Sequence, residues 1–284
     1  MLKKVLCFLL LPVLLHTIAY PQQQIKVMSY NIRLDVASDG DNRWDARKDK
    51  VAALMNYYEA DFIGSQEVQH HQLQYLLSQL TKYNYIGVGR DDGKEAGEYS
   101  CIFYNKEKFE VIQQSTFWLS QTPDSVSMGW DAAYMRVCTY GLFKIKKTGK
   151  LLWVFNTHLD NEGATARLEG IKLITERILK LNKEKNYPVI LSGDFNSLPE
   201  DAPVKYAGNL LQNTRSISKE KPYGPADTWE AFEFNKKPDG CIDYIFVSKD
   251  KRWAVKKFAT ITDSYDMKYP SDHFPILATI ELKK

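Results

Sequence analysis

Polar side chains able to do chemistry occur in this sequence where hydrophobic segments begin or end. Four hydrophobic runs end in the segments SYNIR, IGSQEV, FNTHLD and LSGDFN, and two further segments, CIDYIF and SDHFP, adjoin the start of such runs. Strand ends at one edge of a sheet can converge on one cleft, and rigid strands hold side chains in fixed positions. The segments contain Asn31, Arg33, Gln66, Glu67, Asn156, His158, Asp160, Asp194, Asn196, Asp243, Asp272 and His273.

Each segment alone has an ordinary explanation. The segment containing Asp194 could be a turn, because Asp and Asn are common turn residues. Glu67 could favour the start of the following helix through the helix dipole. His158 could be a hydrogen-bonded structural histidine, and Asp272 could shape a loop. Unrelated turns would not be expected to supply so many carboxylates, amides and imidazoles at strand ends, so we predict one functional site.

The carboxylates of this set are suited to a divalent metal. Oxygen ligands such as Glu67 and Asp272 favour a hard cation, Mg²⁺ or Mn²⁺. Zinc is disfavoured, because the histidines lack a third nitrogen or sulfur partner at the spacing of a zinc site. A cation held by carboxylates neutralises charge on a phosphate during phosphoryl transfer. The residues therefore predict metal-assisted attack of water on a phosphoester.

The attacking water needs a general base. Asp194 or His273 could serve, and Asp243 could orient the imidazole of His273 as a carboxylate orients the histidine of a catalytic triad. Asn31 and Asn196 could contact the phosphate or the water. The sequence has neither a Gly-x-Ser-x-Gly elbow nor a Walker A loop, which argues against a serine hydrolase and a P-loop enzyme.

His158 has two possible roles at such a site. Its imidazole could bind a phosphate oxygen, or it could protonate the leaving oxygen.

Short β-branched or aromatic runs bounded by turn residues predict the strands that must position these groups. They lie at residues 25–30, 62–64, 85–87, 101–104, 137–145, 151–156, 189–191, 243–247 and 276–282. Hydrophobic residues at helical spacing predict helices at residues 45–58, 69–80 and 165–181, the first with Asp45 as its N-cap. Residues 199–227 hold four prolines and are interpreted as a loop-rich excursion. Many strands with few helices predict two sheets packed face to face, with helices outside.

The N-terminus differs from the rest of the chain. Two lysines precede an apolar run, Val5 to Leu15, which is shorter than the ~20 residues that a membrane helix needs. This pattern predicts a signal peptide at residues 1–20 and one catalytic domain at residues 21–284, exported to the periplasm or the cell exterior. An uncleaved anchor is the alternative. Cys101 and Cys138 could be bridged if their strands pair, but small buried core residues are the better interpretation.

The composition is that of a globular protein with a mild net charge of +3. This charge fits a site that handles anions, but it does not imply a surface that coats nucleic acid. No feature indicates a stable protein partner, so we expect a monomer that acts on a phosphate ester, with nucleic acid among the candidates. Aromatic residues in or near loops could stack on bases or sugars, although buried packing is commoner. They are Trp44, Trp118, Trp130 and Trp229.

The six segments, in this order, resemble the signature segments of the endonuclease/exonuclease/phosphatase superfamily, which includes DNase I. The resemblance spans Ile25 to Leu282. It implies an α/β fold, a four-layer α/β sandwich with two mixed β-sheets inside and one metal-dependent cleft. Asn31, Glu67 and Asp272 match the metal-site positions, Asp194 and Asn196 the water-activating pair, Asp243 and His273 the Asp–His pair, and His158 and Arg33 the positions of DNase-like members.

A narrower resemblance concerns exported bacterial members of the superfamily. The segments RWDARK, GVGRDDGKEAGEYSCIFY, TFWLS and MGWDAAYMR resemble this group. They add Arg90, Glu98 and Arg136 as candidates near the cleft. A guanidinium can grip two phosphate oxygens, although surface ion pairs are an almost equal alternative for Arg90 and Arg136. Arg47 is expected on a helix face.

Three functions follow from these observations. The first is an exported, metal-dependent phosphodiesterase or nuclease. The second is a phosphomonoesterase acting on a sugar, inositol or lipid phosphate. The third is a binding module that keeps the fold without catalysis, which the intact set from Asn31 to His273 disfavours.

Overall fold

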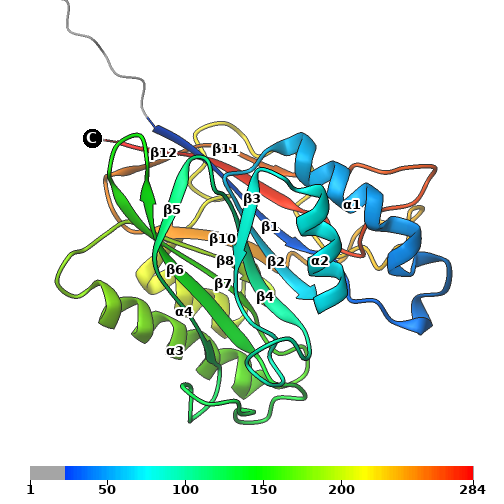
Figure 1. Ribbon diagram of the computed structural model, residues 1–284, viewed down its shortest axis with the longest axis horizontal. Helices are drawn as coiled ribbons and strands as arrows, with labels where there is room; N and C mark the ends of the chain where they lie inside the picture. Colours follow the sequence, from blue (N-terminus) through cyan, green and yellow to red (C-terminus); the bar gives the residue numbers. More distant parts are fainter. Residues whose placement is uncertain (1–22, 284) are drawn as a thin grey trace, which may run out of the picture.

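Two six-stranded β-sheets lie at the centre of the protein, and helices cover their outer faces (Figure 1). The computed structural model describes residues 23–283. The first sheet has the order β11 (Trp253–Thr260), β12 (Ile276–Leu282), β1 (Gln23–Asn31), β2 (Phe62–Val68), β4 (Tyr99–Asn105) and β3 (Tyr83–Ile86). The second has the order β5 (Phe109–Trp118), β6 (Val137–Ile145), β7 (Leu151–His158), β8 (Val189–Asp194), β10 (Asp243–Ser248) and β9 (Leu211–Asn213).

Both sheets are mixed, because β1 and β2 are parallel, β7 and β8 are parallel, and the other neighbours are antiparallel. Helices α1 (Trp44–Tyr58) and α2 (His70–Gln79) pack on the first sheet, and α3 (Ala164–Asn182) and α4 (Ala202–Leu210) pack on the second. A short 3-10 segment, Ala37–Asn42, precedes α1. The predicted four-layer α/β sandwich is confirmed.

The central strands are hydrophobic on both faces because both faces are covered. Along β1, Val27 points into the core between the sheets, and the next residue, Met28, points toward α1 and α2. Neighbouring residues of a strand face opposite sides, so a strand buried on both sides has a continuous hydrophobic sequence. Because this continuous hydrophobic pattern is visible in the sequence, the central strands could be predicted from it.

The strand directions bring the polar residues to one edge. The carboxyl ends of β7 and β8 are level, with His158 opposite Asp194. Strand β10 runs antiparallel to β8, so its first residue, Asp243, also lies opposite Asp194. The carboxyl ends of β1 and β2 lie over the same edge, where Asn31 pairs with Gln66.

Two predicted polar residues lie between the sheets and not in the cleft. Gln66 Nε2 donates to Asn156 Oδ1 at 2.7 Å, and Asn156 Nδ2 donates to the carbonyls of Ser65 and Cys101 at 2.9 and 2.8 Å. The sheets come close here because Gly64 has no side chain. A Cβ at Gly64 would lie 2.3 Å from Ser192 Oγ.

Several elements differ from the sequence-based expectation. The stretch at residues 199–227, expected to be a loop-rich excursion, also contains helix α4 and strand β9, which were not predicted; Pro203 lies in the first turn of α4, where proline is tolerated. Helix α1 begins one residue before Asp45, and Arg43 takes the N-cap position without a side-chain bond. Strands β5 and β11 were not predicted. Both are edge strands with exposed polar residues, which weaken the hydrophobic pattern.

Cys101 and Cys138 are free and buried, and they lie in β4 and β6 of different sheets. The interpretation as core residues is therefore confirmed. Among residues 23–283, no helix is long and apolar enough to cross a membrane. The signal peptide expected at residues 1–20 lies outside the described residues, and it stays a prediction together with the domain boundary.

Candidate active site

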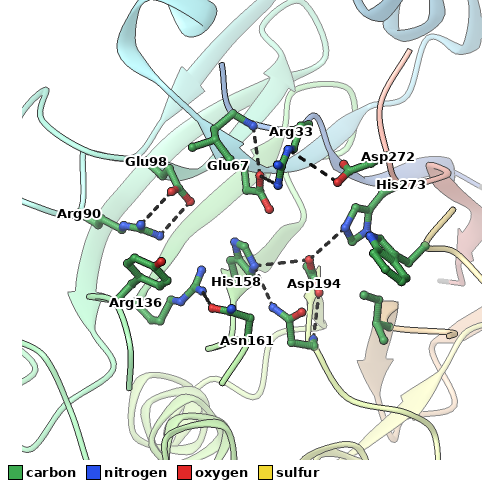
Figure 2. A pocket seen from close by; sticks show the side chains of 15 residues that line it. Arg33, Glu67, Arg90, Glu98, Arg136, His158, Asn161, Asp194, Asp272 and His273 are labelled. Atoms are coloured by element: carbon green, nitrogen blue, oxygen red, sulfur yellow. Dashed lines mark hydrogen bonds and ion pairs between the residues drawn. The ribbon is translucent and has the colours of Figure 1, made fainter. Parts of the chain in front are cut away.

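The predicted site residues meet at one pocket of about 460 Å³ at the edge of the two sheets (Figure 2). Asn31 and Asp243 lie behind the pocket surface and bond to the residues that line it. The others form its lining: Arg33, Glu67, Arg90, Arg136, His158, Asp194, Asn196, Asp272 and His273. The structure thus brings together the residues expected to bind metal, substrate or the attacking water, but not Gln66 and Asn156, and the role of each residue stays a prediction.

Glu67 and Asp272 face each other across the guanidinium of Arg33. Arg33 Nη1 lies 3.8 Å from Glu67 Oε2, and Arg33 Nε lies 3.8 Å from Asp272 Oδ2 (Figure 2). Asp39 binds Arg33 more tightly, with two hydrogen bonds of 2.9 Å. A cation of the protein therefore lies between the two carboxylates that were expected to hold a metal.

Backbone irregularities aim these side chains into the pocket. The pairing of β2 with β4 shifts register between Ser65 and Val68, which is typical of a β-bulge, and Glu67 within it has φ +59°. Arg33 and Asn196, each just beyond a strand end, have φ +59° and +45°. Positive φ at a residue other than glycine costs free energy and gathers at functional sites.

The oxygen-rich donor set fits a hard divalent cation. Ligand atoms of Glu67, His158 and Asp194 lie within 4.8 Å of one another, and so do those of Asp194, Asp243 and His273. Asn31 approaches this cluster with its amide nitrogen, which donates to Glu67 Oε1 at 2.9 Å. Its oxygen accepts from the Arg33 backbone N–H at 3.0 Å, so here Asn31 orients Glu67.

Asp194 is held by a hydrogen bond to each carboxylate oxygen. Its Oδ2 accepts from Asn31 Nδ2 at 3.0 Å, and its Oδ1 accepts from the backbone N–H of Asn196 at 2.9 Å. Burial, together with the nearby charge of Asp243, raises the pKa of Asp194 to about 7. A carboxylate with a pKa near neutrality is a better proton acceptor than an ordinary aspartate.

His273 is fixed by Asp243. The Nδ1 atom of His273 lies 2.9 Å from Asp243 Oδ2, and Thr228 Oγ1 donates to the same oxygen at 2.6 Å. Burial works against the charged imidazole, but Asp243 and Asp194 outweigh it and raise the pKa of His273 well above its ordinary value. These charges therefore favour the imidazolium form of His273, whose Nε2 lies 3.8 Å from Asp194 Oδ2.

His158 differs from His273 in charge. Its Nε2 lies 3.0 Å from Asn196 Nδ2 and 3.4 Å from Asp194 Oδ2. Burial, followed by the charges of Arg136 and Arg90, lowers the pKa of His158 well below its ordinary value. The surroundings thus favour the neutral form of His158 and the charged form of His273.

The opposite wall of the pocket is built from ion pairs. Arg90 binds Glu98 with two hydrogen bonds of 2.8 Å. Arg136 donates through Nε to Asp160 at 3.2 Å and through Nη2 to Asn161 at 2.7 Å. In Figure 2, Arg90, Glu98, Arg136 and Asn161 lie on the side of the pocket away from Asp272 and His273.

Sequence reasoning missed several residues that support the site. Thr228 and Asn161 carry no motif of their own and are recognised only by their contacts. Arg47 was expected on a helix face, but its guanidinium is buried and binds backbone carbonyls of Arg33 and Pro270. Trp229 lines the pocket, whereas Trp44 and Trp118 are buried.

Comparison with known proteins agrees with the fold and the motifs. The model of the Endonuclease/Exonuclease/phosphatase family matches residues 28–273. The structure of an endonuclease/exonuclease/phosphatase family protein from Bacteroides thetaiotaomicron is 36% identical, with a TM-score of 0.88 and coverage of 92% of this chain and 99% of that chain. A mannosyl-6-phosphatase from the same bacterium is 37% identical, with a TM-score of 0.86 and coverage of 90% and 99%.

A more distant similarity links the chain to larger proteins. The CCR4-Not complex 3'-5'-exoribonuclease subunit Ccr4 of Mycosarcoma maydis is 23% identical over 93% of this chain. The chain spans 51% of the length of that relative.

Proposed function

We propose that this chain, which belongs to the endonuclease/exonuclease/phosphatase family, is a hydrolase of phosphoester bonds, and more narrowly a divalent-metal-dependent phosphomonoesterase that removes phosphate from a sugar. The observation that carries the proposal is the single pocket in which Glu67 and Asp272 lie beside Asp194 and the Asp243–His273 pair. We further propose that the protein acts outside the cytoplasm, on the N-terminal pattern of a signal peptide.

Each residue of the pocket has a separate role in the proposed reaction. Asp194, oriented through both of its oxygens, accepts a proton from the attacking water as the water oxygen bonds to phosphorus and the bond from phosphorus to the sugar oxygen breaks; the leaving sugar oxygen takes a proton from solvent. His273 offers the charged N–H of Nε2 to the phosphate, and Asp243 holds its ring. Neutral His158 and Asn196 bind a phosphate oxygen. A Mg²⁺ or Mn²⁺ ion bound by Glu67 and Asp272 would neutralise negative charge that develops on the phosphate.

Two observations favour a monoester of a small alcohol. The wall made by Arg90, Glu98 and Arg136 limits the pocket on the side away from His273. A volume of about 460 Å³ is in the range of small-molecule sites. The mannosyl-6-phosphatase, 37% identical over nearly its whole length, supports the same class of substrate.

A phosphodiesterase or nuclease, the first function predicted from the sequence, is the second candidate. Its support is the pair of exposed aromatic rings at the pocket, Tyr134 and Trp229, which are 49% and 40% exposed and could stack on bases. The distant similarity to an exoribonuclease subunit points the same way.

A hydrolysis panel tests the proposal. It compares mannose 6-phosphate, glucose 6-phosphate, para-nitrophenyl phosphate, bis-para-nitrophenyl phosphate and single-stranded nucleic acid, each with Mg²⁺, with Mn²⁺ and with a chelator. We expect sugar phosphates to be the best substrates and the chelator to abolish turnover. A preference for the diesters would replace the proposal with the second candidate.

The role of Asp194 is tested in the same panel. We expect Asp194→Asn to lower kcat by roughly 10²–10⁴, the contribution of an acid–base group. The matched control is Asp124→Asn, because the Asp124 side chain is 80% exposed, pairs with Arg177 and is not part of the pocket. Turnover of Asp194→Asn equal to that of the control would remove Asp194 from the mechanism.

A further inference from the structure

The ion-paired wall of the pocket has a chemistry different from that of the carboxylate cluster. We propose that this wall binds the sugar ring of the substrate, and that Glu98 determines specificity by accepting hydrogen bonds from sugar hydroxyls. The inference rests on the proposed function, because it concerns the alcohol that leaves the phosphate.

The carboxylate of Glu98 is held as a fixed hydrogen-bond acceptor. Arg90 donates to both of its oxygens at 2.8 Å, and the side chain of Glu98 is 14% exposed in the pocket lining. A carboxylate has about four lone-pair positions, so each oxygen retains one after binding Arg90. Trp118 Nε1 donates to the Arg90 carbonyl at 2.7 Å, which fixes the backbone of this pair. Sugar hydroxyls are the donors that such an acceptor recognises.

The charges of the wall disfavour a second phosphate. Arg90 is neutralised by Glu98, and Arg136 by the buried carboxylate of Asp160. An anion at the wall would meet the negative charge of Glu98, whereas the other side of the pocket holds Glu67 and Asp272, which are proposed to bind the metal ion that attracts the phosphate. A substrate with one anionic and one neutral polyhydroxylated end matches this division. In this arrangement Arg90 and Arg136 lie beside the sugar ring of the substrate and not beside its phosphate.

Tyr134 supplies an aromatic face beside these groups. Its ring lies 5.3 Å from the Arg90 guanidinium carbon and 5.5 Å from that of Arg136, but 49% of the residue stays exposed. The backbone N–H of Tyr134 donates to Asp160 at 3.3 Å, which ties the ring to the same ion-paired frame. An aromatic face combines apolar contact with a polar edge, and this suits a sugar ring.

The experiment measures the preference for a sugar over a leaving group without hydroxyls. For each variant, kcat/KM is determined for mannose 6-phosphate and para-nitrophenyl phosphate with the same divalent metal. We expect Glu98→Gln and Tyr134→Ala each to lower the sugar-to-aryl ratio by about ten-fold or more, the effect of losing a contact with one substrate only. Tyr134 is half-exposed, so we expect Tyr134→Ala to fold, and its thermal unfolding is measured beside that of the wild type.

Two control variants share the chemistry of the substitutions but lie away from the pocket. Glu95→Gln changes a carboxylate of the same loop that is 74% exposed, and Tyr223→Ala removes a ring that is 79% exposed. We expect both controls to keep the wild-type ratio. An unchanged ratio in Glu98→Gln and Tyr134→Ala, with monoesters still hydrolysed, would overturn the sugar site alone.

A nucleotide substrate distinguishes contact of the Tyr134 ring with a sugar from stacking of the ring on a base. If Tyr134→Ala lowers kcat/KM for uridine 5'-monophosphate but not for mannose 6-phosphate, the ring stacks on a base and the sugar site is wrong. Hydrolysis of diesters without any monoester activity in the wild-type protein would contradict both the proposed function and the site that rests on it.

Discussion

At the scale of single residues, the site contains a histidine, His273, whose charged form is favoured by two neighbouring carboxylates. Asp243 accepts two hydrogen bonds at one oxygen, from His273 and from Thr228, at 2.9 and 2.6 Å. The charges of Asp243 and Asp194 hold the pKa of His273 above its ordinary value in spite of burial. Removing the charge of Asp243 must therefore lower the pKa of His273.

Titration by NMR checks this prediction. In the metal-free protein we expect the His273 imidazole to remain protonated at neutral pH, and we expect Asp243→Asn to lower its pKa, because the variant lacks the neighbouring negative charge. His70 and His71 lie outside the pocket and serve as internal controls. The activities of Asp243→Asn, His273→Ala and the double variant should be non-additive, because the pair acts as one unit. Additive losses would show that the two residues act separately.

The buried carboxyl group of Glu230 makes the free energy of unfolding depend on pH. Neither of its buried carboxylate oxygens has a hydrogen-bond partner among the described residues, and its backbone N–H donates to the Asp272 carbonyl at 2.9 Å. Burial and the charge of Asp272 raise the pKa of Glu230 from 4.5 to about 8. Between these values the folded protein keeps a proton that the unfolded chain has lost, so the free energy of unfolding falls as pH rises.

We expect Glu230→Gln to remove this dependence. With a chelator present, the variant should be more stable than the wild type by about 1–3 kcal/mol at pH above 8, with no gain below the unfolded pKa. Thermal unfolding across pH measures the difference. Glu233→Gln, at a more exposed position that pairs with Lys236, is the matched control. An identical pH profile for Glu230→Gln and the wild type would contradict the prediction.

At the scale of elements, helix α1 carries the residue that joins two loops of the site. Arg47 donates to the carbonyls of Arg33 at 2.6 Å and Leu34 at 3.3 Å in the loop after β1, and to Pro270 at 3.2 Å before β12. It also binds the Ile32 carbonyl. The first loop carries Arg33 and the second leads to Asp272. Arg47 is therefore a positioning residue for both sides of the proposed metal site.

We expect Arg47→Lys to weaken the metal site, because an ammonium cannot reach all of these carbonyls. The Mg²⁺ concentration that gives half-maximal activity should rise several-fold, and kcat should fall. Lys48→Met, on the same helix but partly exposed, is the control. A loss of thermal stability with unchanged Mg²⁺ dependence would limit Arg47 to a structural role.

The elements and site residues that could be predicted are each marked by a local pattern in the amino-acid sequence. Strands β1, β7 and β8 are buried on both faces and end in polar residues, so the chain shows both the strand and its end. Strands β5 and β11 lie at sheet edges and lack this contrast. Thr228 and Arg47 act through contacts with residues far along the chain, and no local pattern marks such contacts.

At the scale of the whole molecule, the approach of the two sheets near the site depends on Gly64. A Cβ there would lie 2.3 Å from Ser192 Oγ and 2.5 Å from Asn156 Oδ1. We expect Gly64→Ala to lower the free energy of unfolding by about 1–3 kcal/mol through overpacking, and Ser192→Gly to restore part of the loss. Denaturant unfolding measures both.

Gly208→Ala is the same substitution in a permissive place. Gly208 lies in helix α4 and has no atom within 4 Å of a new Cβ. Alanine favours helix more than glycine by roughly 1 kcal/mol, so this variant should be at least as stable as the wild type. If Gly64→Ala is equally well tolerated, the sheets do not need the glycine.

The pairing of β1 with β12 also determines at which stage of folding the protein becomes active. These are the first and last strands of the described chain, joined from Gln23 opposite Leu282 to Ser29 opposite Ile276. Asn31 ends one strand, and Asp272 and His273 precede the other, so the pocket closes only with this contact. Contacts between distant parts of a chain form slowly, because a large loop must first close. During refolding, hydrolysis should therefore return after the helices and hairpins have formed, and a ribosome-bound chain that lacks β12 should be inactive.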